Sequence, residues 1–351
     1  VFREIQWDRP LYAKSEPGTM NLLVILQGGE KDKPSRILRL DTTRPTETEE
    51  FLEIDGRLAY GLAFDPDYAT NGFLYVFTNG PTVEPERKNR ISRFQVGRNP
   101  SRECDPSSEL VIIEWRSMGH DGGEMGFGAD GMLYISSGDG TSDSDGWLSG
   151  QDVSNLLGGV LRIDVRGATA TAPYKVPLDN PFVGVDGARG ELWAFGLRNP
   201  WRLWCDQPSG QVWVGNNGQD LWESVHLIRR GENYGWSVYE GSHPFYPQRQ
   251  RGPAAIVPPT IEHHHTEARS LTGGLVYRGE KHPELDGVYL YGDYSTGKIW
   301  GVRHDGSQVT WHQELADTVH QIAGFAISPS GEVLVVCLLY TSDAADDEYN
   351  V

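Results

Sequence analysis

The sequence predicts an all-β protein, a six-bladed β-propeller of four-stranded antiparallel blades. One observation is a repeated design, in which a turn rich in Gly, Asp, Pro or Ser adjoins a short β-branched and aromatic run. A second is the composition, because 42 glycines, 21 prolines and 11 tryptophans in 351 residues are typical of many short strands joined by tight turns. A third is that no long segment keeps the 3.6-residue apolar period of a helix.

The repeated runs give the number of blades. Six runs are present, and their starts are about 45 to 80 residues apart, which is the room that a four-stranded blade with variable loops needs. Turn signals such as Asp65-Pro66-Asp67 and Pro208-Ser209-Gly210 precede or accompany them. The runs are Leu22–Leu26, Phe73–Phe77, Met132–Ser136, Val212–Val214, Val288–Tyr291 and Val333–Val336.

We expect a single propeller domain over residues 1–336, because no stretch of the sequence resembles an interdomain linker. The segment 337–351 abandons the strand-turn pattern where a last strand would close the ring, and we expect a disordered or non-native tail there. The N-terminus has no basic segment followed by an apolar one, so a signal peptide is either absent or already removed.

Charge and hydropathy exclude two classes of partner. A formal net charge of −18 repels a phosphate backbone, and no basic run overrides it, so we expect no nucleic-acid partner. No stretch approaches the roughly 20 apolar residues that a membrane-spanning helix needs. Cys104, Cys205 and Cys337 form no CxxC or CxxCH pattern, which argues against structural zinc and covalently attached haem and leaves one disulfide open.

A histidine and an aspartate lie in glycine-rich loops on either side of one predicted strand. His120 is in Gly119–Gly123 and Asp139 is in Gly138–Gly140, so both can lie at the same end of one blade hairpin. There a neutral imidazole can take a proton from an alcohol, and Asp139 can orient it. The spacing also allows a simpler interpretation, in which Asp139 caps a turn and His120 is a polar loop residue.

Two further segments carry polar groups suited to ligands. Arg198 and Asn199, held by Pro200, form a donor pair suited to a planar anionic or carbonyl-bearing ligand. The alternative is an ordinary turn whose arginine pairs with a surface carboxylate. Glycine-rich loops at 215–223 and 231–236 offer main-chain carbonyls and carboxylates, the oxygen ligands that Ca²⁺ prefers. Because EF-hand spacing is absent, a polar inter-strand loop is the alternative.

A run of three histidines, His263-His264-His265, could suggest a metal site. Adjacent residues on a strand point to opposite faces, so the run is interpreted as a polar surface loop.

Taken together and in this order, these blocks resemble the signature blocks of the glucose/sorbosone dehydrogenase family. The resemblance extends from about Leu22 to Val336. It rests on Gly119-His120, Gly138-Asp139, Arg198-Asn199-Pro200, Gly218-Gln219 with Glu223, Asn233–Trp236, Gly61–Asp67, Leu271–Gly274, Tyr291–Tyr294 and Gly297–Trp300.

The resemblance implies an enzyme that holds pyrroloquinoline quinone (PQQ) over the central channel and oxidises an aldose sugar or related alcohol with the help of Ca²⁺. His120 matches the general base of such enzymes, and Asp139 matches the residue that orients it. Arg198 and Asn199 match residues that contact the quinone. The resemblance also implies a periplasmic or extracellular location and a separate electron acceptor such as a cytochrome.

The same resemblance implies the calcium ligands. The carbonyls of Gly218 and Gln219 fall where the Ca²⁺ beside the cofactor is bound, and Tyr234, with Glu223, falls in a nearby calcium region.

The sequence departs from the family pattern at three places. Asp55–Tyr60 stands where the sugar dehydrogenases carry a glutamine, and His320–Ala323 corresponds to an arginine pair. Ser295-Thr296 stands where they carry a lysine, with Lys298 as a shifted substitute that would contact the cofactor. Each lost charge-assisted contact weakens binding by about 1.5 to 3 kcal/mol. Two other functions therefore stay open: a non-catalytic propeller that binds carbohydrate or protein, and a calcium-dependent hydrolase of the lactonase type.

Overall fold

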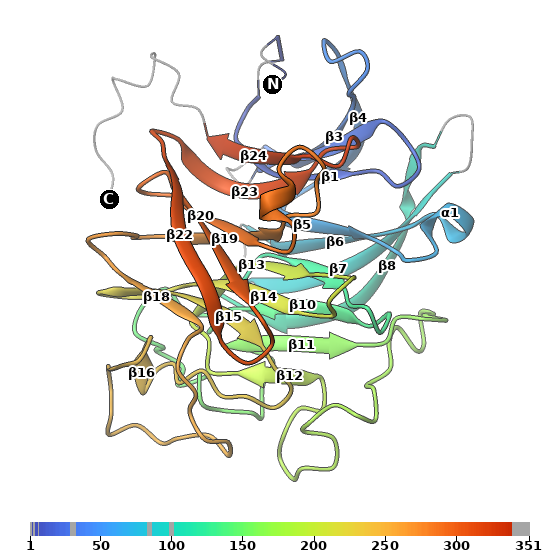
Figure 1. Cartoon of the computed structure of the whole chain (residues 1–351). Helices are drawn as coiled ribbons and strands as arrows, with labels where there is room; N and C mark the ends of the chain where they lie inside the picture. The colour runs from blue at the N-terminus through green and yellow to red at the C-terminus, as the bar shows by residue number, and fades with distance from the viewer. Residues whose placement is uncertain are drawn as a thin grey trace.

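The regular secondary structure of the chain is almost entirely β-strand, joined by turns and long loops (Figure 1). The computed structural model describes residues 2, 4–5, 7–28, 33–82, 86–97 and 102–338. Within these ranges the helical segments are two short turns, α1 (Tyr68–Asn71) and η1 (Pro283–Leu285). The strands form five four-stranded antiparallel blades and a two-stranded sheet, together with a short hairpin.

Each blade is a meander of strands that follow one another along the chain. The first two blades are β1 (Pro10–Ser15), β2 (Asn21–Leu26), β3 (Ser35–Asp41), β4 (Thr48–Ile54), and β5 (Leu58–Phe64), β6 (Phe73–Gly80), β7 (Lys88–Val96), β8 (Cys104–Arg116). The third and fourth are β9 (Met125–Phe127), β10 (Leu133–Ser137), β11 (Gly159–Ile163), β12 (Leu192–Phe195), and β13 (Asn199–Cys205), β14 (Val212–Asn217), β15 (Trp222–Ile228), β18 (Ile261–His264). The fifth is β19 (Leu271–Val276), β20 (Tyr289–Asp293), β21 (Lys298–His304), β22 (Val309–Asp317). The hairpin is β16 (Tyr239–Glu240) with β17 (His243–Pro244), and the two-stranded sheet is β23 (Gln321–Ile327) with β24 (Val333–Leu338).

The sheets are arranged as a propeller. The first strands of successive sheets pack side by side, from β1 through β5, β9, β13 and β19 to β23, and β23 packs against β1 in turn. Figure 1 shows β23 and β24 beside the first blade. The all-β propeller and its antiparallel four-stranded blades are as predicted. The described residues form five such blades rather than six, because the sheet in the last position has two strands.

The six predicted runs all fall on the second strand of a sheet, namely β2, β6, β10, β14, β20 and β24. The last of these strands continues through Leu338, two residues past the expected end of the domain at 336. The rest of the expected tail, residues 339–351, lies outside the described residues.

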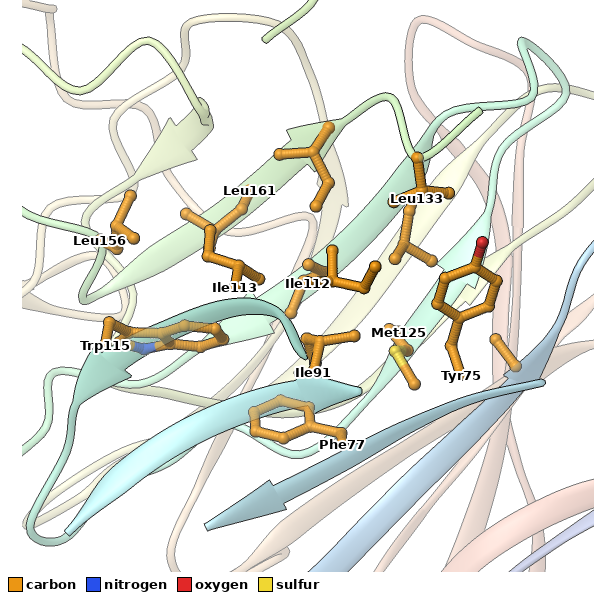
Figure 2. Packing of buried hydrophobic residues seen from close by; sticks show 14 of the residues in the cluster. Tyr75, Phe77, Ile91, Ile112, Ile113, Trp115, Met125, Leu133, Leu156 and Leu161 are labelled. Atoms are coloured by element: carbon orange, nitrogen blue, oxygen red, sulfur yellow. The ribbon is translucent and has the colours of Figure 1, made fainter. Parts of the chain in front are cut away.

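The apolar core is divided into wedges between neighbouring blades. In the wedge between the second and third blades, Phe77 and Ile91 meet Leu133 and Leu161 (Figure 2). Comparable clusters lie between the other neighbouring sheets. Burial of this apolar surface is the main force that holds one blade against the next. Polar groups also lie among the first strands, near the ring axis.

One of these polar groups is the guanidinium of Arg202, on β13, which is 1 % exposed. It donates hydrogen bonds to the carbonyl oxygens of Leu11 at 2.7 Å, Tyr60 at 2.9 Å and Ala323 at 3.2 Å. These carbonyls belong to β1, β5 and β23, so one side chain links four sheets around the axis. Burial lowers the pKa of Arg202, and the carboxylate of Glu124 opposes that change.

Two smaller expectations concern the membrane and the cysteines. Across the described ranges, we find no helix with the length and apolar character needed to cross a bilayer. Cys104, Cys205 and Cys337 are free thiols, so the disulfide that the sequence left open does not form.

Candidate active site

The loops that carry the predicted site residues lie at one end of the ring. The antiparallel pairing of β9 with β10 brings the segment before Met125 and the segment after Ser137 to the same end. In the fourth blade, Asn199 at the start of β13 pairs with Asn217 at the end of β14. Hydrogen bonds join the two blades there, because the amide of Asp139 donates to the carbonyl of Arg198 at 2.8 Å.

His120 and Asp139 form a hydrogen-bonded pair, with 2.8 Å between His120 Nδ1 and Asp139 Oδ1. Asp139 is fully buried and also accepts hydrogen bonds from the Thr141 amide at 3.0 Å and from Trp236 Nε1 at 2.8 Å. The side chain of His120 keeps 12 % of its surface exposed. The carboxylate is therefore fixed from several sides, while the imidazole can still reach a ligand.

Glycines allow these two loops to pack closely. A Cβ at Gly138 would lie 2.3 Å from the carbonyl oxygen of His120, and a Cβ at Gly119 would lie 2.3 Å from the carbonyl carbon of Thr141. Neither distance is compatible with a side chain larger than hydrogen. The glycines on both sides of the pair therefore let His120 and Asp139 approach each other.

A second buried carboxylate supports the histidine loop. Asp121, next to His120, accepts hydrogen bonds from the hydroxyls of Tyr60 at 2.9 Å and Ser117 at 2.5 Å, and from Asn79 Nδ2 at 2.9 Å. Burial raises the pKa of Asp121. The sequence reasoning missed this residue, although it stands inside the Gly119–Gly123 block.

Arg198 is a buried cation without a counter-ion in the described part of the chain. It is 8 % exposed, and its Nε donates to Gln219 Oε1 at 2.8 Å, while Nη1 donates to the Asn217 carbonyl at 3.4 Å. Its guanidinium also lies 5.7 Å from the ring centre of Trp236. Burial lowers the pKa of Arg198, and the nearby carboxylates only partly offset this. Such a group is stabilised by an anionic ligand.

Asn216 sets the position of the Arg198-Asn199 pair. Its Oδ1 accepts the backbone N–H of Arg198 at 3.0 Å and that of Asn199 at 3.1 Å. The side-chain oxygen of Asn199 accepts the Gly122 amide at 3.2 Å, which ties this pair to the histidine loop. The structure thus brings His120, Asp139, Arg198 and Asn199 into one hydrogen-bonded assembly.

A central cavity of about 240 Å³ opens beside Asn199, near the axis. First strands of four sheets contribute to it, and no Lys or Arg is among the described residues that line it. The lining residues are Leu11, Asn199, Trp201, Asn217, Ser270, Leu271, Thr272, Tyr294 and Ala323.

In the loop after β14, three successive backbone amides are bonded to a single carboxylate. The amides of Gln219, Asp220 and Leu221 all donate to the carboxylate of Glu240, on the β16–β17 hairpin. The carbonyls of Gly218 and Gln219 accept no hydrogen bond from the described residues. Sequence reasoning missed Glu240, because nothing in the sequence shows that it faces a loop 20 residues earlier.

The other two calcium candidates already have protein partners. Glu223 is 1 % exposed, and its Oε1 accepts His265 Nε2 at 2.9 Å while Oε2 accepts the Leu271 amide at 3.0 Å. The hydroxyl of Tyr234 donates to Glu232 at 2.9 Å. In the residues that the structure describes, no group of three or more His, Cys, Asp or Glu side chains is placed to hold a metal ion.

Lys298 is not brought to this assembly. It lies on β21, the third strand of its blade, where its Nζ pairs with Glu314 at 2.9 Å. The shifted substitute that the sequence suggested for the family lysine is therefore directed to a neighbouring strand, and it does not line the central cavity.

The interpretation of His263–His265 as a surface loop is wrong. His263 is on β18 and is 2 % exposed, with its Nε2 2.9 Å from the hydroxyl of Tyr291. The ring of His263 packs against Trp300 and His312 of the fifth blade, which buries it. His265 contacts Glu223.

The contact between His265 and Glu223 predicts a pH dependence. The hydrogen bond that His265 donates to Glu223 raises the pKa of His265. A histidine with a raised folded-state pKa stabilises the fold below the unfolded pKa of about 6.5, and this contribution disappears as the pH rises through the folded value. We expect His265→Gln to lower the free energy of unfolding by about 1 kcal/mol or less at pH 5, and by less at pH 9. Urea unfolding at both pH values measures this; an equal loss at both would contradict it.

The profile of the glucose/sorbosone dehydrogenase family matches residues 37–341. The chain belongs to this family. The HIPL1 protein of Arabidopsis thaliana is 29 % identical over 354 residues, which cover 82 % of this chain and 50 % of that protein. The human Hedgehog-interacting protein is 29 % identical over 258 residues, which cover 68 % of this chain and 33 % of that protein. The chain thus spans half or less of the length of these curated relatives.

The fold is shared with solved structures. The PQQ-bound aldose sugar dehydrogenase of Streptomyces coelicolor superposes with a TM-score of 0.72 at 21 % identity, over 94 % of this chain and 88 % of that chain. This likeness shows a shared fold. The family resemblance inferred from the sequence blocks is confirmed.

Proposed function

We propose that this chain is an oxidoreductase that oxidises a hydroxyl of an aldose sugar or related alcohol, with PQQ as electron acceptor and Ca²⁺ beside it. The observation that carries the proposal is the His120–Asp139 pair in hydrogen-bonded contact with the segment of Arg198, a buried arginine without a counter-ion. The family, which includes oxidoreductases by name, supports the reaction class.

The residues present fit an anionic, carbonyl-bearing cofactor. Arg198 has a charge that no described carboxylate pairs with, and Asn199 lines the central cavity beside it. The carbonyls of Gly218 and Gln219 would hold Ca²⁺, whereas Glu223 and Tyr234 are used within the protein. PQQ has three carboxylates, and the cavity lining has no cation, so we expect weaker binding than a full set of cations would give. When bound, the quinone supplies an acceptor for hydride.

The chain's own residues supply proton transfer and a favourable field. A carboxylate only accepts hydrogen bonds, so His120 Nδ1 carries the proton toward Asp139 and Nε2 is left to take the proton of a substrate hydroxyl. Asp139 orients the ring and stabilises the imidazolium that results. Thr141 and Trp236 keep Asp139 in place, and Arg198 stabilises negative charge that develops on oxygen.

Titration of the purified protein with PQQ in the presence of Ca²⁺ tests this function. We expect saturable binding by calorimetry, followed by reduction of an artificial acceptor when aldoses or alcohols are added. Removal of Ca²⁺ with a chelator should weaken cofactor binding. Absence of cofactor binding at millimolar concentration would refute the proposal.

The proposal includes a cellular setting. The substrate would be a small sugar or alcohol, and a separate acceptor such as a cytochrome would take up the electrons, because the sequence has no CxxCH motif for an attached haem. We place this reaction in the periplasm or outside the cell.

A non-catalytic binding propeller is the second candidate. It is favoured by the likeness to the Hedgehog-interacting protein and by the absence of Lys and Arg from the described lining of the central cavity. In that case the protein would fold, ignore the quinone and retain a carbohydrate or protein ligand, so the same titration separates the two candidates.

A further inference from the structure

A larger cavity, of about 670 Å³, lies among the loops that follow Asp139, and we call it the loop cavity. Its walls come from residues 145–153, from 185–186, and from 237 with 249–253. Its volume lies within the range of roughly 300–1,000 Å³ that small-molecule sites occupy. None of its lining residues belongs to the proton-transfer assembly described above.

The lining combines apolar surface with polar groups of both kinds. Trp147 is 37 % exposed, Leu148 58 % and Val185 44 %, although large apolar side chains are usually covered. Asp186 contributes acceptors, and Arg251 contributes donors. Both of these charged side chains are exposed.

The ring of Trp147 is held in place. The guanidinium of Arg116 lies over it, 4.3 Å from the ring centre, in a cation–π contact. Since the side chain still exposes more than a third of its surface, the ring is both anchored and accessible to a ligand in the cavity.

The floor of the loop cavity is hydrogen-bonded and is linked to the loop of Asp139. Asp145 is 1 % exposed and accepts hydrogen bonds from the Ser149 amide at 2.7 Å and from the Ser237 hydroxyl at 2.6 Å. The hydroxyl of Ser149 in turn donates to the carbonyl of Asp139 at 2.6 Å. Ser144, Asp145 and Leu148 have positive φ of 49°, 50° and 55°. Non-glycine residues in this region are costly and concentrate at functional sites.

We propose that the loop cavity binds a neutral oligosaccharide, with one sugar ring on Trp147 and hydroxyls bonded to Asp186 and Arg251. Sugar rings have apolar C–H faces and hydroxyls that both donate and accept, so they match an aromatic ring flanked by a carboxylate and a guanidinium. An acidic saccharide is disfavoured, because the formal net charge of the chain is −18. The proposal goes beyond the oxidation of a hydroxyl and does not require the cofactor.

Calorimetry of the full chain without quinone tests it, with maltotriose, cellotriose and raffinose as neutral probes and a sialylated trisaccharide as the acidic one. We expect saturable binding of at least one neutral probe and none of the acidic probe. Trp147→Ala and Asp186→Ala should each weaken that binding at least tenfold, whereas Trp147→Phe should keep it within about threefold. Leu178→Ala is the control, because Leu178 is 89 % exposed elsewhere on the chain and should change nothing.

Two results would overturn the proposal: no neutral probe binds, or a probe binds with equal affinity to wild type and to both Trp147→Ala and Asp186→Ala. Circular dichroism of each variant confirms that it is folded. The cofactor-loaded protein separates this proposal from the oxidation itself, because Trp147→Ala should leave monosaccharide turnover unchanged. Neutral saccharide binding without any turnover would refute the oxidoreductase assignment alone.

Discussion

Replacing His120 by alanine is expected to lower kcat for alcohol oxidation by about 10²- to 10⁴-fold, because the variant lacks the group that takes the hydroxyl proton. The side chain keeps 12 % of its surface exposed and is hydrogen-bonded to Asp139, so circular dichroism of the variant checks that it is folded. Turnover is measured on protein loaded with PQQ and Ca²⁺, with glucose and an artificial acceptor. Cofactor affinity, measured by titration, should change much less than kcat.

The matched control for this experiment is His282→Ala. The side chain of His282 is 60 % exposed near η1, and its partner is Glu284 at the surface. Its replacement should leave kcat within about twofold of wild type. If His120→Ala retains full turnover while the cofactor is bound, His120 is not the base, and the proton must go elsewhere.

Asp139→Asn tests how the histidine is held. Asparagine has the same shape but presents an amide that can donate where the carboxylate only accepts, so the imidazole can adopt the wrong tautomer. We expect a fall in kcat and a shift of the pH–rate profile, because the carboxylate no longer stabilises the imidazolium. An unshifted profile with reduced kcat would indicate a merely structural role for Asp139.

The strands that the sequence predicts correctly share one property. β2, β6, β10, β14 and β20 are each hydrogen-bonded on both sides, and their burial is nearly continuous, so they appear as unbroken apolar runs. Two of the first strands, β9 and β13, escape this reasoning. β9 has three residues, and β13 carries Pro200 and the buried Arg202, so neither shows an apolar pattern. The sixth run, on β24, predicts a sixth four-stranded blade, whereas β24 belongs to a two-stranded sheet. One apolar strand does not indicate how many strands lie beside it.

The sequence predicts the part of the candidate site that depends on two loops of one strand hairpin. His120 and Asp139 meet because antiparallel pairing and close-packed glycines bring two neighbouring loops together. The calcium role of Glu223 follows from the family resemblance and from its place in a glycine-rich loop, and it stays a prediction. What the sequence did not show is that its oxygens accept hydrogen bonds from His265 and from the Leu271 amide, more than 40 residues later in the chain. Such long-range pairing depends on the packed fold and leaves no local signal.

Replacing Arg202 by methionine is expected to destabilise the fold by about 4 kcal/mol or more. Methionine keeps the length of the side chain but cannot donate, so the buried carbonyls of Leu11 and Tyr60 lose their hydrogen bonds. The carbonyl of Ala323 keeps only the longer bond from Trp201 Nε1, at 3.4 Å. Each unsatisfied buried acceptor costs about 1–3 kcal/mol. The buried carboxylate of Glu124 also loses a stabilising positive charge. Urea unfolding followed by tryptophan fluorescence measures the loss.

Arg166→Met is the matched control, because the side chain of Arg166 is 67 % exposed and pairs with Asp164 at the surface. Such pairs contribute about 0–1 kcal/mol, so this variant should unfold near the wild-type midpoint. Arg202→Lys should be intermediate, since the ammonium keeps the charge but cannot span carbonyls on three strands as a planar guanidinium does. A loss under 1 kcal/mol for Arg202→Met would mean that the apolar wedges alone close the ring, because the axial hydrogen bonds would then add nothing to the contacts between blades.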